Sequence, residues 1–126
     1  LFDNIVLVAA DTNTLGHPEW VDRLHCRGRI FVCINEKDHA LAASRMKSGE
    51  EQLARLGHSL HGLDSRRATY VDFTNASYVG NSHAYFEGNA ADRNSSVKDY
   101  FSAAFSGERA EEGLRFNAAW NAYEFR

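Results

Sequence analysis

The sequence of 126 residues has little of several features that mark specialised classes of protein. It contains two cysteines, Cys26 and Cys33, too few for a disulfide-stabilised scaffold. Its longest apolar run, residues 5–10, is far shorter than the roughly 20 residues that a helix needs to cross a bilayer. No secretory signal is visible. The formal net charge of −3 argues against a nucleic-acid partner, because phosphate binding needs a concentrated basic surface.

What remains is an ordinary globular composition, with 44% hydrophobic and 25% charged residues. The chain opens with Leu-Phe-Asp, and its only methionine is Met46. A strand-like run begins at residue 4, almost without lead-in. We therefore expect residues 1–126 to be a single partial domain, the carboxyl-terminal portion of a longer polypeptide. A processed or trimmed chain would begin in the same way.

Three runs rich in β-branched residues predict strands at residues 4–9, 29–34 and 68–73. The first two are continuously apolar, as strands are when both faces of a parallel sheet are covered. The third alternates, so we expect it nearer an edge. This pattern predicts an α/β fold of about three parallel strands with flanking helices.

Helix-period segments lie between and after these runs. We predict helices at residues 18–24, 39–47 and 50–56, and a C-terminal helical segment over residues 92–126. In that segment Ser106 and Gly107 separate two helices, of which the first presents one apolar face. The loop at residues 74–91, rich in Asn, Ser and Gly, is long enough to suggest a functional role.

Chemistry in an open α/β sheet sits beyond the carboxyl ends of the strands. Asp11 follows the first predicted strand, Asp38 the second and His83 the third. Serine hydrolases of this architecture place the nucleophile first, then an acid, then a histidine. The imidazole removes the proton of the serine hydroxyl, and the carboxylate orients the imidazole. We predict Asp38 and His83 as catalytic residues, with Asp11 as the alternative acid.

Three segments of the chain carry a family resemblance. Residues 2–11 (FDNIVLVAAD) are similar to a strand that ends in Ala-Pro-Asp. Residues 38–45 (DHALAASR), followed by Arg-Leu-Gly at residues 55–57, resemble the motif Asp-x-Ala-Leu-x-x-Ser and a later Arg-Leu-Gly. Residues 82–86 (SHAYF) resemble Gly-His-Ser-Tyr. Together they resemble an alpha/beta-hydrolase family of unknown function that is predicted to be esterase- or lipase-like.

The resemblance implies the C-terminal part of a three-layer alpha/beta-hydrolase sandwich, with Asp38 as triad acid and His83 as base. It implies a small acyl-ester substrate and no cofactor. The family's nucleophile motif, His-Ser-Met-Gly-Asn, is absent here, and no Gly-x-Ser-x-Gly occurs. We therefore expect the serine and the oxyanion hole in a missing N-terminal half of the same domain, and expect this chain alone to be inactive.

Other interpretations of the sequence remain. The chain could be a non-enzymatic α/β binding or interaction module with a degenerate hydrolase site. A nucleotide-binding domain is disfavoured because no Gly-rich turn joins a strand to a helix. His58 and His61 lack partners at the spacing of a metal site, so we predict no metal, and we expect His17 in a surface turn. Compartment and oligomeric state stay open.

Overall fold

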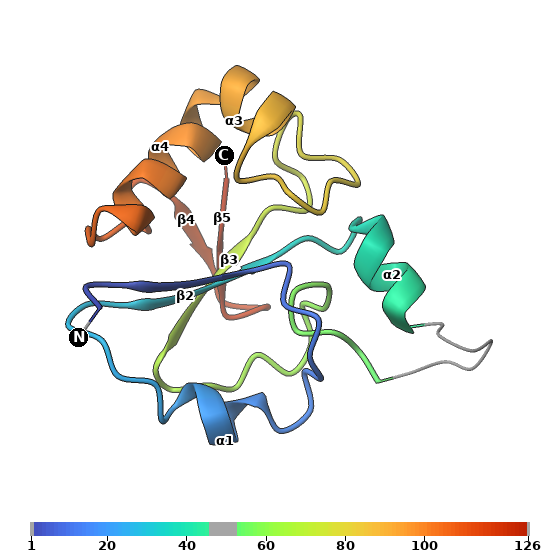
Figure 1. Ribbon diagram of the computed structural model, residues 1–126, viewed down its shortest axis with the longest axis vertical. Helices are drawn as coiled ribbons and strands as arrows, with labels where there is room; N and C mark the ends of the chain where they lie inside the picture. The colour runs from blue at the N-terminus through green and yellow to red at the C-terminus, as the bar shows by residue number, and fades with distance from the viewer. Residues whose placement is uncertain (1, 46–52, 126) are drawn as a thin grey trace.

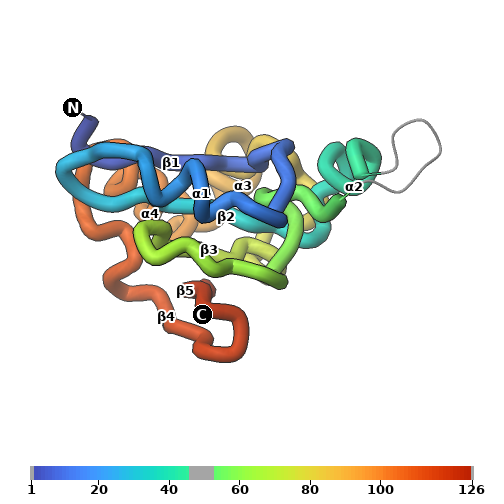
Figure 2. Tube along the Cα trace, turned by 90° about the horizontal axis from the view of Figure 1, so that it is seen from below, coloured from blue at the N-terminus to red at the C-terminus, as the bar shows by residue number. Residues whose placement is uncertain are grey.

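The computed structural model describes residues 2–45 and 53–125, and a five-stranded sheet forms its centre. The strands lie in the order β1-β2-β3-β5-β4, as Figure 2 shows from one edge to the other. Their bounds are β1 Ile5–Val8, β2 Ile30–Ile34, β3 Ala68–Asp72, β4 Arg115–Asn117 and β5 Ala122–Glu124. The pairs β1–β2, β2–β3 and β3–β5 are parallel, and β4 is antiparallel to β5. The predicted α/β class is confirmed.

Helices cover both faces of this sheet (Figure 1). Their bounds are α1 His17–Val21, α2 His39–Arg45, α3 Gly88–Arg93 and α4 Ser95–Phe105. The helices α3 and α4 lie on one face, and α1 lies on the other together with the irregular segment at residues 53–67. The helix α2 follows the carboxyl end of β2 and extends beyond that end of the sheet.

The helix α4 shows how the sequence builds one core. The side chain of Asn94 caps its first turn by accepting a hydrogen bond of 3.1 Å from the Val97 N–H. Apolar residues then recur on one helical face. They pack against buried side chains of β2 and β3 in a core that includes Phe31, Cys33, Val71, Val97, Tyr100, Phe101 and Ala104. The predicted apolar face is confirmed except at Phe105, which is 61% exposed. The helix begins at Ser95 rather than residue 92.

The carboxyl end departs from the predicted helical segment. Residues 115–124 form the hairpin β4–β5, and β5 pairs with β3 in parallel. In β5, Ala122 packs into the core on one face of the sheet, and Tyr123 packs against the core on the α4 face. The strand therefore contributes side chains to both cores. Two strands of three residues each are too short to show a period of two in the sequence. Over the residues that the structure describes, the sheet therefore has five strands rather than about three, and β3 is interior rather than near an edge.

The other predicted helices are partly confirmed. The helix α2 covers residues 39–45 of the predicted 39–47, whose last two positions lie outside the described residues. Of the predicted helix at residues 50–56, the described part is not helical. Its backbone instead bonds the loop after β1, with the Leu56 N–H 2.7 Å from the Thr12 carbonyl oxygen. His17 is fully buried rather than in a surface turn, because Thr14 and Tyr70 satisfy its ring nitrogens.

Candidate functional site

The carboxylate of Asp38 is held by the start of α2. The backbone turns after β2, and the Asp38 N–H donates to the Asn35 carbonyl oxygen at 3.1 Å. The Asp38 side chain is fully buried, and its Oδ1 accepts a hydrogen bond of 2.9 Å from the Leu41 N–H in the first turn of the helix. Such a bond satisfies one of the free N–H groups that begin every helix. The first turn of α2 thereby orients the carboxylate independently of its other partners.

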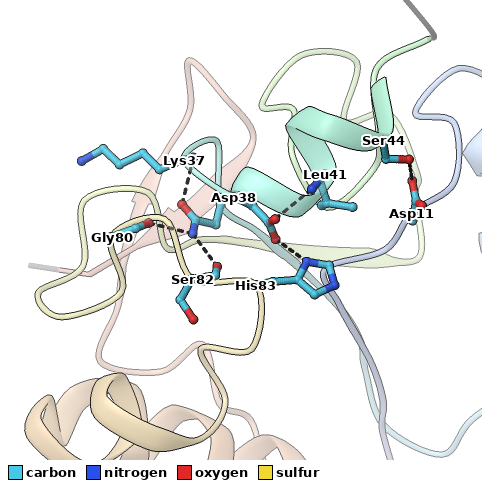
Figure 3. Close-up of polar contacts among 9 residues, drawn as sticks. Asp11, Lys37, Asp38, Leu41, Ser44, Gly80, Ser82 and His83 are labelled. Carbon is cyan, nitrogen blue, oxygen red and sulfur yellow. Dashed lines mark hydrogen bonds and ion pairs between the residues drawn. The ribbon is translucent and has the colours of Figure 1, made fainter. Parts of the chain in front are cut away.

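The second oxygen of this carboxylate faces His83 (Figure 3). The distance from His83 Nδ1 to Asp38 Oδ2 is 2.8 Å, although the residues are 45 positions apart. The His83 side chain is 49% exposed while that of Asp38 is fully buried. An ionised carboxylate only accepts hydrogen bonds, so Nδ1 carries the proton. A neutral ring in this tautomer presents the lone pair of Nε2.

The parallel sheet explains why the two residues meet. Asp38 lies four residues beyond β2 and His83 lies in the loop after β3, and these strands are neighbours. The carboxyl ends of parallel neighbours lie at the same edge of a sheet. Within the part of the chain that the structure describes, no hydrogen-bond partner is seen for His83 Nε2. The arrangement is an oriented imidazole whose outer nitrogen can accept a proton.

Asp11 makes different contacts from those expected of the alternative acid. Its Oδ1 accepts a hydrogen bond of 2.6 Å from Ser44 Oγ and lies 3.4 Å from Arg55 Nη1. These bonds join the loop after β1 to α2 and to the segment that crosses it. The carboxylate that the structure brings to His83 is that of Asp38.

Asn35 is a site neighbour that the sequence analysis missed. Its side-chain amide is buried and donates to the carbonyl oxygens of Gly80 and Ser82, at 2.9 and 3.1 Å. Its Oδ1 accepts from the Lys37 N–H at 3.1 Å. An asparagine directly after a strand is typical of an ordinary turn, so no sequence signal separates it from one.

Two buried groups near the site remain neutral. Burial raises the pKa of Tyr85 well above its ordinary value, and the nearby Cys33 and Asp38 raise it further. Burial also raises the pKa of the Cys33 thiol to about 12. Nucleophilic attack by a cysteine requires the thiolate. Neither group therefore replaces a serine near neutral pH.

Residues 2–45 and 53–125 contain neither a metal-binding cluster nor a membrane-spanning helix. No group of three or more His, Cys, Asp or Glu side chains is disposed to hold a metal ion there. His61 packs edge-on against Trp120, with ring centroids 5.3 Å apart. Cys26 and Cys33 are both free thiols. None of the helices in these ranges is long and apolar enough to span a bilayer.

Comparison with known proteins gives no assignment for the site. No protein-family model, no curated protein and no solved structure matches this chain. The geometry of Asp38 and His83 is therefore the feature that points to a function.

Proposed function

We propose that this chain carries the acid and the base of a serine hydrolase that cleaves small acyl esters. In this proposal it is the C-terminal portion of an alpha/beta-hydrolase sandwich, and Asp38 and His83 are two members of the triad. The observation that supports it is the 2.8 Å contact between a fully buried carboxylate and a half-exposed imidazole. The contact lies beyond the carboxyl ends of adjacent parallel strands, where such sheets hold their chemistry.

The proposed reaction uses both nitrogens of His83. As a serine Oγ attacks the ester carbonyl, Nε2 takes the hydroxyl proton, and Asp38 stabilises the resulting imidazolium through Nδ1. The tetrahedral intermediate collapses, the bond to the alkoxide breaks, and Nε2 returns the proton to give the free alcohol. Water then attacks the acyl-enzyme while Nε2 takes its proton. As the second intermediate collapses, the bond to the serine Oγ breaks, Nε2 returns the proton to Oγ, and the acid is released.

The serine and the oxyanion hole would come from a polypeptide segment outside this sequence. The open edge of β1 offers a place for that segment. β1 is the last strand on its side of the described sheet, and all four of its residues, Ile-Val-Leu-Val, are only partly buried. An apolar edge strand without charge or proline is a template for pairing. We propose that further strands of the same domain pair there.

Ester hydrolysis by a longer polypeptide that contains this chain tests the proposal. We expect it to cleave p-nitrophenyl butyrate and to be labelled on serine by a fluorophosphonate, whereas residues 1–126 alone do neither. His83→Ala should lower kcat by at least about 1,000-fold, because loss of the base removes general-base catalysis.

The matched control is His25→Ala. His25 is also exposed, but it precedes the amino end of β2, at the opposite end of the strand from the candidate site. The His25→Ala variant should leave the rate of ester turnover unchanged. Hydrolysis that survives His83→Ala in a folded protein would remove the assignment. The absence of both hydrolysis and serine labelling would favour a non-enzymatic α/β interaction module.

A further inference from the structure

The side chain of Asn35 connects the two loops that hold the candidate acid and base. Asn35 follows β2 directly and is fully buried. Its amide nitrogen donates to two carbonyl oxygens of the loop after β3, those of Gly80 and Ser82. Its oxygen accepts from the Lys37 N–H in its own loop. Figure 3 labels Lys37, Gly80 and Ser82, the three residues whose backbone groups make these hydrogen bonds.

These bonds lie next to Asp38 and His83 in the chain and can therefore restrain both residues. Asn35 lies three residues before Asp38, and its carbonyl oxygen accepts from the Asp38 N–H. Ser82 shares a peptide bond with His83, so holding the Ser82 carbonyl restrains the backbone that carries the imidazole. Misplacement of a reacting group by about 1 Å can cost about 100-fold in rate.

A second connection between the loops is more exposed. The His39 N–H donates to the Asn81 carbonyl oxygen at 3.3 Å, and Asn81 Nδ2 lies 3.2 Å from His39 Nδ1. Both side chains are exposed, so water competes for the contact between them. Asn35 is buried, so water cannot readily replace its three bonds.

We propose that Asn35 is a positioning residue. It holds the loop of the acid and the loop of the base at the spacing at which His83 donates to Asp38. This inference rests on the proposed function and adds to it a residue that acts through His83 rather than on the substrate. Its donors matter more than its acceptor, because only the donors cross between the loops.

Asn4 provides a matched control in the same chain. Its Nδ2 donates to the carbonyl oxygens of Ala104 and Glu108, both at 3.0 Å, and its Oδ1 accepts from the Arg29 N–H at 2.9 Å. These are the same three kinds of bond that Asn35 makes. Asn4 precedes the amino end of β1, at the opposite end of the sheet from the site. Asn4→Ala therefore removes the same three kinds of bond from a partly buried side chain and leaves the two loops untouched.

The experiment measures the Nδ1 proton of His83 and, separately, catalysis. In the 126-residue chain labelled with nitrogen-15 histidine, this proton should give a downfield NMR resonance that is absent from His83→Ala. We expect Asn35→Ala and Asn35→Asp to lose or broaden it, Asn35→Ser to retain part of it, and Asn4→Ala to retain it fully. In the hydrolytically active polypeptide, Asn35→Ala should lower kcat about 100-fold with little change in KM.

The outcomes separate this inference from the proposed function. A resonance that persists in Asn35→Ala as it does in Asn4→Ala overturns the positioning role, whatever the activity. Failure of all three Asn35 variants to fold, while Asn4→Ala folds, would make Asn35 a residue of the fold alone and would also overturn it. A resonance that depends on Asn35 in a protein without esterase activity would remove the hydrolase proposal and leave Asn35 as the residue that holds the pair.

Discussion

Two substitutions of Asp38 separate its role in the fold from its role in the site. Asp38→Ala removes the acceptor of the Leu41 N–H in the first turn of α2 and the partner of His83. Loss of a helix cap costs about 1 kcal/mol. The bond to a half-exposed imidazole adds at most about 1 kcal/mol. We expect a total loss of about 2 kcal/mol, which for a domain of this length lowers the Tm by roughly 7 °C.

Asp38→Asn should behave differently, because asparagine caps helices about as well as aspartate. Its Oδ1 can still accept from the Leu41 N–H, so we expect a loss of about 0.5 kcal/mol or less. Its amide would donate to His83 Nδ1, which forces the proton onto Nε2. That tautomer cannot act as the base, and turnover should fall by about 10,000-fold.

Chemical denaturation followed by circular dichroism gives the stabilities, and ester hydrolysis by the longer polypeptide gives the activities. Equal destabilisation by Asp38→Asn and Asp38→Ala would show that the charge, rather than the cap, holds this part of the fold. Full activity of Asp38→Asn would refute the tautomer argument.

Three further predictions concern the buried side chains of Tyr70, Cys33 and Asp72. Tyr70→Phe removes the hydroxyl that bonds Nε2 of the buried His17, so unfolding in urea should show a loss of about 1–3 kcal/mol; an unchanged midpoint would contradict this. Because burial raises the pKa of Cys33 to about 12, Ellman's reagent at pH 8 should titrate only Cys26 in the native protein, and both thiols after unfolding. Burial raises the pKa of Asp72 above its ordinary 3.8. At pH 7 the ionised carboxylate therefore costs free energy in the folded state that it does not cost in the unfolded chain. Asp72→Asn should therefore increase the free energy of unfolding at pH 7. This gain should vanish as the pH falls below 3.8. Thermal melts of both proteins recorded across that pH range would check the prediction.

The strands β1, β2 and β3 were predictable because each is a run of consecutive residues rich in β-branched side chains. The described β1, β2 and β3 each lie within the predicted run, at residues 4–9, 29–34 and 68–73. The C-terminal hairpin was not predictable, since its apolar residues also fit a helical repeat. What decides between the two is β3, whose second edge accepts β5 through Val71 and Asp72. Such pairing is a tertiary contact, and local periodicity does not contain it.

The candidate site divides in the same way. The order of an acid after one strand and a histidine after the next is a feature of the sequence, and parallel pairing of β2 with β3 is enough to bring Asp38 and His83 together. Asn35 escaped prediction because its importance lies in its partners, Gly80 and Ser82, which are backbone carbonyl groups. Every residue has a backbone carbonyl group, so the residue types of a loop do not show which carbonyl oxygen will accept a hydrogen bond.

The unequal exposure of the pair argues for a site rather than a stabilising ion pair. An exposed pair contributes little to stability, and a buried pair must recover the cost of desolvating both groups. Here the carboxylate is fully buried and receives a helix N–H, while the imidazole is half exposed. The helix N–H bond accounts for a stabilising role of the carboxylate, but stability alone does not account for a half-exposed histidine on its second oxygen. A triad needs both conditions at once, because the acid must hold one tautomer and Nε2 must remain accessible to a hydroxyl group.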